Sequence, residues 1–182
     1  MSFLGGGTDF EDYYKIHGGA VLSTAINKNV YIIVKERFDD YIYINYSKKE
    51  IVDDVSKLEH GLVREAMKLT NVEKGIEITT LADVPAEGTG LGSSSSITVG
   101  LLHALYTYRG EIFTQRTLAD QACHIEIERL HKPIGRQDQY IAAFGNMRFI
   151  SFNEKGIDIE YIQLASELKT HRLKKSTLWS LW

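Results

Sequence analysis

A glycine- and serine-rich stretch, residues 85–96, carries the clearest chemical signal in the sequence. It follows a predicted strand and opens a predicted helix, where glycines let the backbone approach an anion and the helix N-terminus offers N–H groups at a positive dipole end. Its serine hydroxyls can bind phosphate or Mg²⁺. No lysine follows the last glycine as a Walker A loop requires. The stretch therefore predicts a phosphate-binding loop of another kind, with an ordinary serine-capped loop as the alternative.

Two further stretches combine glycines with polar side chains. Residues 2–10 read Ser-Phe-Leu-Gly-Gly-Gly-Thr-Asp-Phe, and residues 133–140 read Pro-Ile-Gly-Arg-Gln-Asp-Gln-Tyr. Each is weak alone, because Thr8-Asp9 after glycines is commonly a turn with a helix cap, and Asp138 is a natural cap for a helical turn over residues 139–143.

Taken in order, the three motifs resemble the GHMP kinase superfamily, the group of galactokinase, homoserine kinase, mevalonate kinase and phosphomevalonate kinase. The motifs over residues 2–10 and 133–140 are similar to the subgroup that phosphorylates the anomeric hydroxyl of sugars, especially D-glycero-D-manno-heptose 7-phosphate kinases. The resemblance covers residues 2–165 and implies an N-terminal ATP-binding domain with an α+β, ribosomal protein S5 domain 2-like fold. It also implies ATP and Mg²⁺, with the ATP phosphates held at Pro85, Gly88, Gly90, Leu91, Gly92, Ser93, Ser94 and Ser95.

The resemblance assigns sugar binding to the motif over residues 2–10. Asp9, with Thr8 beside it, is expected to accept hydrogen bonds from sugar hydroxyls, while Gly6 and Gly7 let the backbone approach the ring. A sugar-side turn at His17 and Gly18 is a weaker expectation, since His17 equally fits an exposed helix end.

The resemblance also makes Asp138 the catalytic aspartate. Its expected role is general base on the anomeric hydroxyl, or a fixed negative charge that orients this hydroxyl for in-line attack. Arg136 is a further candidate, to stabilise charge on the transferred phosphoryl group, although a surface arginine is the commoner explanation.

A Mg²⁺ ligand is expected on the helix before that turn, where Glu126 and Glu128 are the candidates. At about 100° per residue they lie about 200° apart and cannot both face the site. Glu126 falls within the apolar arc, where a carboxylate needs a cation as partner, whereas Glu128 falls on the polar flank. We therefore expect Glu126 to bind the metal together with the Ser94 hydroxyl, and Glu128 to be solvated.

Hydrophobic patterns predict the elements that position these residues. Residues 30–35 and 41–46 are expected to form an antiparallel hairpin, residues 76–80 a third strand, residues 21–26 a weaker one, and residues 147–152 and 157–162 a closing pair. Amphipathic helices are expected over residues 58–69, 96–106 and 114–130, the last capped by Thr114. The order of these elements favours a single mixed sheet with packed helices, an α+β domain.

Composition narrows the function classes. With 21 Lys and Arg against 24 Asp and Glu, the net charge of -3 gives no electrostatic footprint for nucleic acid or an anionic membrane, so the ligand is expected to be small. The single cysteine, Cys123, cannot form an internal disulfide and reads as a core residue. No apolar run approaches the ~20 residues of a membrane span. A cytoplasmic protein is the expectation.

The pattern changes after residue 165. Residues 166–182 match no predicted element, and nothing there resembles the second domain of the GHMP kinases, so we interpret them as a truncation, frameshift or artificial end. The sequence thus predicts an ATP-dependent sugar kinase domain, most like a heptose 7-phosphate 1-kinase. Alternatives are an L-fucokinase-like or galactokinase-like 1-kinase, or a catalytically silent nucleotide-binding fragment. A homo-oligomer or a separately supplied C-terminal domain is the expected partner.

Overall fold

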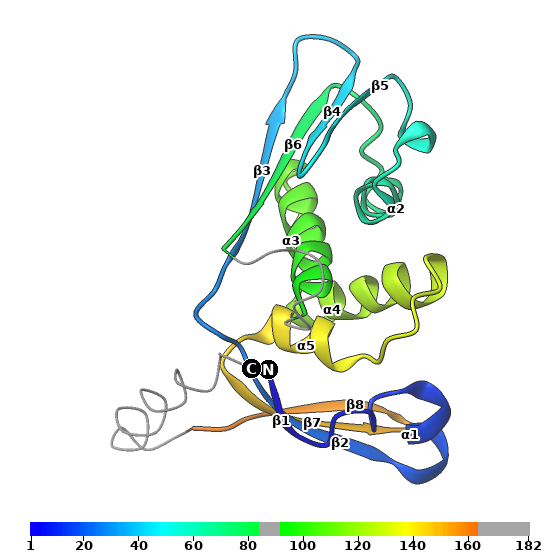
Figure 1. Cartoon of the computed structure of the whole chain (residues 1–182), viewed down its shortest axis with the longest axis vertical. Coiled ribbons are helices and arrows are strands. Elements are labelled where there is room, and N and C mark those ends of the chain that lie inside the picture. The colour runs from blue at the N-terminus through cyan, green and yellow to red at the C-terminus, as the bar shows by residue number, and fades with distance from the viewer. Residues whose placement is uncertain (84–91, 164–182) are drawn as a thin grey trace.

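The computed structural model describes residues 1–83 and 92–163 of the 182-residue chain. Pro85, Gly88, Gly90 and Leu91 of the predicted phosphate loop, and the tail over residues 166–182, lie outside this part. Within it the strands form two four-stranded sheets with helices between them (Figure 1). The first sheet has the order β1 (Ser2–Leu4), β2 (Gly19–Thr24), β7 (Met147–Asn153) and β8 (Gly156–Tyr161), and the second the order β3 (Val30–Glu36), β6 (Ile76–Ala82), β4 (Ile42–Asn45) and β5 (Lys49–Val52).

The helices bury both sheets and so produce two hydrophobic cores. They are α1 (Glu11–His17), α2 (Gly61–Leu69), α3 (Ser93–Tyr108), α4 (Gln115–Cys123) and α5 (Gln137–Phe144), with a 3₁₀ turn η1 (Val55–Lys57) and a π-helical segment η2 (His124–Arg129). Residues of α2 and α3 pack on the β3-β6-β4-β5 sheet. Residues of α1, α4 and α5 pack on the β1-β2-β7-β8 sheet. Burial raises the pKa of the Cys123 thiol in this second core, as expected for a packing residue and not a nucleophile.

The prediction that β3 and β4 pair as an antiparallel hairpin is wrong. Both strands exist, but β6 lies between them, antiparallel to β3 and parallel to β4. The reason is burial, because Ile76 and Ile78 of β6 are both fully inaccessible to solvent and the interior position of the sheet covers them from both sides. A short-range turn signal at residues 38–40 cannot show that a strand from 30 residues later will separate the two.

The closing pair at the end of the domain is confirmed, since β7 and β8 are antiparallel neighbours. They belong, however, to the sheet that contains β2, so the expected single sheet is replaced by two. The mixed α+β character itself is confirmed. Strands β1 and β5 and helix α1 are additional elements that are too short for a clear periodic signal.

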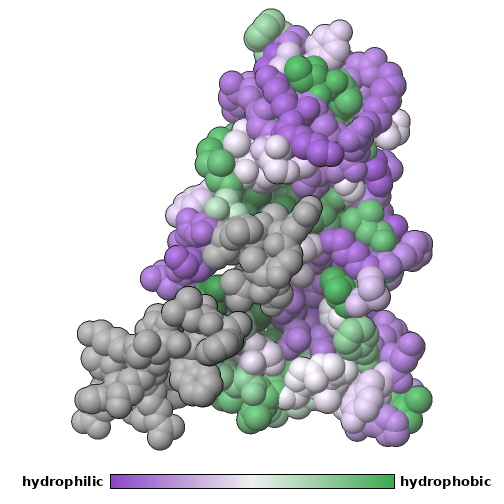
Figure 2. Space-filling model, in the orientation of Figure 1, coloured by the Kyte–Doolittle hydropathy of each residue, from purple (hydrophilic) through white to green (hydrophobic). Residues whose placement is uncertain are grey.

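The face of the molecule drawn in Figure 2 carries both polar and hydrophobic residues. Figure 2 shows hydrophilic residues over much of the β3-β6-β4-β5 half, and hydrophobic residues interspersed along the other sheet. Phe3 and Leu4 of β1 and Ile16 of α1 are among the exposed hydrophobic side chains. No helix in residues 1–83 and 92–163 is long and apolar enough to span a bilayer.

Candidate active site

The N-termini of α3 and α5 meet at the centre of the molecule. Gly92, the N-cap of α3, has a φ of 68°, and Asp138 lies in the first turn of α5. A Cβ atom at Gly92 would lie 3.2 Å from Cγ of Asp138 and 3.3 Å from its Oδ2. The predicted phosphate loop and the predicted catalytic aspartate, 46 residues apart in sequence, are therefore direct neighbours.

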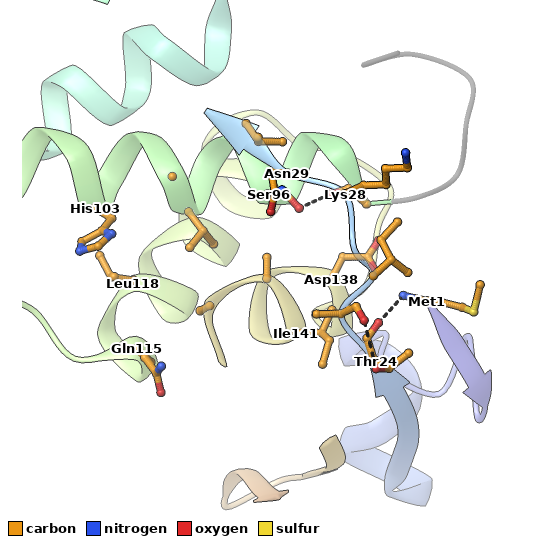
Figure 3. Close-up of a pocket in the computed structure, with 18 of the residues that line it drawn as sticks. Met1, Thr24, Lys28, Asn29, Ser96, His103, Gln115, Leu118, Asp138 and Ile141 are labelled. Carbon is orange, nitrogen blue, oxygen red and sulfur yellow. Dashed lines mark hydrogen bonds between the residues drawn. The ribbon is translucent and has the colours of Figure 1, made fainter. Parts of the chain in front are cut away.

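Asp138 lies in an environment that disfavours its charge. Burial is the main cause that raises the pKa of its carboxyl group; the chain's terminal ammonium opposes this, while the carboxylates of Asp9 and Glu126 add to it. Its side chain borders a cavity of about 580 Å³ that also touches Gly92 and Ser96 of α3 and Lys28 and Asn29 from the β2–β3 connection (Figure 3). A ligand in this cavity can therefore reach the carboxylate.

A second carboxylate, Glu126, is fully buried beside the same helix end. The Ser94 hydroxyl donates a short hydrogen bond to its Oε1 atom. The ammonium group of Lys132 lies 3.0 Å from the same oxygen and 2.5 Å from Oγ of Ser94. The other oxygen, Oε2, accepts a 2.8 Å hydrogen bond from the side-chain amide of Gln139 in α5. Three side chains, from two helices and a loop, thus converge on one buried charge.

The local backbone explains why Glu126 faces inward. Thr114 caps α4 as predicted, with its hydroxyl accepting from N of Thr117. The helix then widens into the π-helical η2, in which N of Leu130 donates to O of Ile125. Such wider turns are frequent at functional sites. Although the predicted helix is not regular throughout, Glu126 points into the protein and Glu128 is exposed with His124, so the predicted orientations are confirmed.

The donor set suits a hard divalent cation. Glu126 and Ser94 supply a carboxylate oxygen and a hydroxyl oxygen, and a buried carboxylate needs a positive partner. No cluster of three or more His, Cys, Asp or Glu residues with metal-binding geometry exists within the described residues. This is compatible with Mg²⁺, which is commonly held by one or two carboxylates together with substrate phosphates.

Asp9 lies at the junction of two loops. It is only 2% exposed, and its oxygens accept hydrogen bonds from N of Gly7 at 3.2 Å and N of Gln137 at 3.0 Å. Gly135 packs so closely that a Cβ atom there would lie 2.0 Å from Oδ2 of Asp9. The carboxylate therefore fixes the residue 5–9 loop to the loop that leads into Asp138.

Replacing Asp9 by Asn is expected to destabilise the fold by about 1–3 kcal/mol, because the amide NH₂ cannot accept from a backbone N–H and leaves one of the two donors unpaired. Urea denaturation measures the change. Asp12→Asn, at an exposed position in the helix α1 that follows Asp9, is the control. Equal stabilities of the two variants would show that the buried bonds of Asp9 contribute nothing.

The other residues predicted for the sugar are Thr8, Gly6 and Gly7 in the loop of Asp9, and His17 and Gly18 at the far end of α1. The Thr8 hydroxyl accepts a hydrogen bond from N of Ala20 at 3.1 Å and donates one to O of Gly5 at 2.8 Å. It therefore connects the residue 5–9 loop to β2. A Cβ atom at Gly7 would meet no atom within 4 Å, and Gly6 is exposed. His17 is exposed at the end of α1 opposite Asp9 and contacts the ring of Tyr13, and Gly18 is the C-cap of that helix.

Arg136 is paired with acidic side chains. Its guanidinium forms a 2.6 Å ion pair with Glu11 of α1 and lies 4.0 Å from Glu128. Its Nε atom is buried without a hydrogen-bond partner among the described residues. This arrangement favours a role in holding α1 against the α5 loop over a direct role on a phosphoryl group.

Sequence reasoning missed two residues of the site. Lys132 lies in a loop without periodicity, and Gln139 reads as an ordinary helix residue. The available signal was the buried Glu126 itself, because an inward carboxylate requires a cation and a hydrogen-bond donor within reach. Ser93 and Ser95, by contrast, were predicted for the phosphate loop and lie buried in the first turn of α3.

Comparison with known proteins identifies a family and relatives that this chain resembles. Residues 60–146 match the family model of the GHMP kinases N terminal domain. The D-glycero-alpha-D-manno-heptose 7-phosphate kinase of Campylobacter jejuni is 30% identical over 186 residues, which covers 93% of this chain and 55% of that protein. The galactokinase of Thermotoga maritima is 25% identical over 176 residues, which covers 92% of this chain and 48% of that protein.

Among solved structures, a D-glycero-D-manno-heptose 1-phosphate kinase from Bacteroides thetaiotaomicron is similar, with a TM-score of 0.85 and 28% sequence identity. The similarity covers 92% of this chain and 59% of that one. The expected ribosomal protein S5 domain 2-like fold of these kinases is thereby confirmed. The chain spans about half the length of the curated relatives it matches.

Proposed function

The chain carries the N-terminal domain of the GHMP kinases, and on this premise we propose that residues 1–165 form the nucleotide-binding part of an enzyme that transfers the γ-phosphoryl group of ATP to the anomeric hydroxyl of a sugar phosphate. The observation that carries the proposal is the close approach of Asp138 to Gly92. It places an aspartate directly at the helix N-terminus where phosphates would bind.

In this proposal each residue acts on position or charge. Phosphoryl transfer depends mainly on alignment and on stabilisation of the charge of the transferred group. The first turn of α3 would bind the nucleotide phosphates through backbone N–H groups. Asp138 would accept a hydrogen bond from the acceptor hydroxyl, and its raised pKa suits it to receive the proton. Glu126 and Ser94 would hold Mg²⁺, which neutralises phosphate charge when bound.

The proposed substrate is D-glycero-D-manno-heptose 7-phosphate, which would be converted to the 1,7-bisphosphate. Support comes from the Campylobacter relative, whose name states this substrate, and from the heptose kinase structure that superposes well on this chain. The motif over residues 2–10, which resembles the sugar 1-kinases, lies against the loop that leads into Asp138, to which Asp9 is hydrogen-bonded.

The test compares two glutamates that lie two residues apart. Glu126→Gln is expected to weaken Mg²⁺-dependent ATP binding at least about tenfold, because it removes the charged metal ligand. Glu128→Gln is expected to leave the affinity nearly unchanged, because Glu128 is exposed and pairs with His124. Titration calorimetry with ATP, in the presence of Mg²⁺ and in the presence of EDTA, measures both. Equal effects of the two variants would refute the assignment of Glu126.

A further inference from the structure

Lys132 occupies the position next to Glu126 in which a metal ion would be expected. Its ammonium group contacts both Oε1 of Glu126 and Oγ of Ser94, the two atoms proposed as metal ligands. Within the described residues no other cationic group lies within 4.0 Å of Glu126. The Lys132 side chain is 30% exposed, so it is not enclosed as Glu126 is.

The backbone brings Lys132 back onto Glu126. After η2 the chain reverses at His131, which has a positive φ of 51°. N of Lys132 then donates to O of Glu126 at 3.0 Å, and N of Ile134 donates to O of Lys132 at 2.9 Å. The contact therefore has two components, one between the backbones of the two residues and one between their side chains.

Gln139 decides which oxygen of Glu126 is available. Its amide donates to Oε2, so Oε1 is the oxygen that faces Ser94 and Lys132. An ammonium ion and a divalent cation cannot share this oxygen and the Ser94 hydroxyl, because both charges are positive and the same acceptor atoms would be needed. One must leave when the other binds.

From these contacts we infer that Lys132 is a resident counter-ion of the Glu126–Ser94 pair and competes with the divalent cation for it. The inference rests on the proposed function, in that this pair is taken as the metal site. The lysine keeps the buried carboxylate paired while the site is free of metal, and its partly exposed side chain swings out when the cation binds. It thereby lowers the affinity of the free protein for the metal.

The experiment uses Mn²⁺ alone as the probe, titrated into the protein without nucleotide and followed by the electron paramagnetic resonance signal of free Mn²⁺. Lys132→Met, which removes the charge, is expected to bind Mn²⁺ at least about tenfold more tightly than the parent protein. Lys132→Arg, which keeps it, should bind no more tightly than the parent. The control is Lys57→Met, because Lys57 forms an exposed ion pair with Asp53 in another part of the molecule. It should leave the affinity unchanged.

Removal of Lys132 also leaves the buried Glu126 without a cationic partner, which is destabilising. Thermal unfolding therefore accompanies the titration, and Mn²⁺ is expected to raise the Tm of Lys132→Met more than that of the parent. A variant that is folded only with Mn²⁺ supports the inference, and one that is unfolded with and without it contradicts the inference. The double variant Lys132→Met with Glu126→Gln removes both charges and should bind no Mn²⁺.

Failure of the inference can be told from failure of the proposed function. Equal Mn²⁺ affinities of the parent and Lys132→Met overturn the counter-ion role, while Mg²⁺-dependent ATP binding that is sensitive to Glu126→Gln leaves the proposed function standing. If Glu126→Gln leaves the Mg²⁺-dependent ATP affinity unchanged, the proposed metal site is wrong, and the inference fails with it.

Discussion

Replacement of Asp138 by Asn is expected to lower phosphoryl transfer by about 10²-fold or more, the usual range for loss of a positioned base, with ATP affinity nearly preserved. Asparagine keeps the size of the side chain but removes its charge and its ability to take a proton. Because this chain covers 55% of the Campylobacter relative, turnover is to be measured after residues 1–163 are joined to the remaining half of that protein. ATP affinity is measured on the chain itself.

The same substitution is expected to stabilise the folded chain near neutral pH. Burial raises the pKa of Asp138 above its ordinary value of 3.8, so the folded state binds more protons than the unfolded state, and stability falls as the pH rises through this window. Asp138→Asn removes that loss. Its advantage in Tm should therefore be present at pH 7 and vanish below about pH 4.

Asp12→Asn, on the exposed side of α1, is the control for both measurements and should change neither. Full turnover in Asp138→Asn would remove this residue from the mechanism. A destabilised Asp138→Asn at neutral pH would instead show that the carboxylate is held by favourable contacts, contrary to the environment described above.

Replacement of Gly92 by Val is expected to abolish detectable ATP binding. A side chain at this residue would press on the Asp138 carboxylate at 3.2–3.4 Å and fill the space at the N-terminus of α3. The φ of +68° adds backbone strain of about 1–3 kcal/mol. Calorimetric titration with ATP and Mg²⁺ measures the loss.

The structure offers a matched control for Gly92. Gly110 has a similar φ of +75°, but a Cβ atom there would meet no atom within 4 Å. Gly110→Val should therefore show comparable backbone strain in Tm and normal ATP binding. If Gly92→Val binds ATP as well as Gly110→Val does, the loop is structural and the proposed kinase site fails at its strongest point.

The sequence carried enough information to predict single elements and the orientation of side chains on them. Glu126 inside and Glu128 outside follow from helical periodicity, and Thr114 follows from capping chemistry. Pairings between distant segments were less accessible. The insertion of β6 between β3 and β4 depends on the burial of Ile76 and Ile78 in a sheet that no local pattern describes.

In the site, too, the sequence predicts individual residues but not the contacts between distant segments. The three motifs contain most of its residues, but only the fold shows that Gly92 lies directly beside Asp138 and that Asp9 holds the two loops together. Lys132 was missed because its position depends on the widened turn of η2 and the reversal at His131. Neither irregularity follows from propensity.

The central claim is that this chain binds ATP with Mg²⁺ at the α3 N-terminus and a sugar phosphate beside it. Thermal unfolding with ATP and Mg²⁺, with D-glycero-D-manno-heptose 7-phosphate, and with both tests it most directly. A ligand at 100 times its Kd stabilises by about 2.7 kcal/mol, and each kcal/mol raises the Tm of a chain of this size by about 2–4 °C. We predict a rise with ATP that requires Mg²⁺ and a further rise when the sugar phosphate is added; an unchanged Tm with saturating ATP and Mg²⁺ would contradict the account.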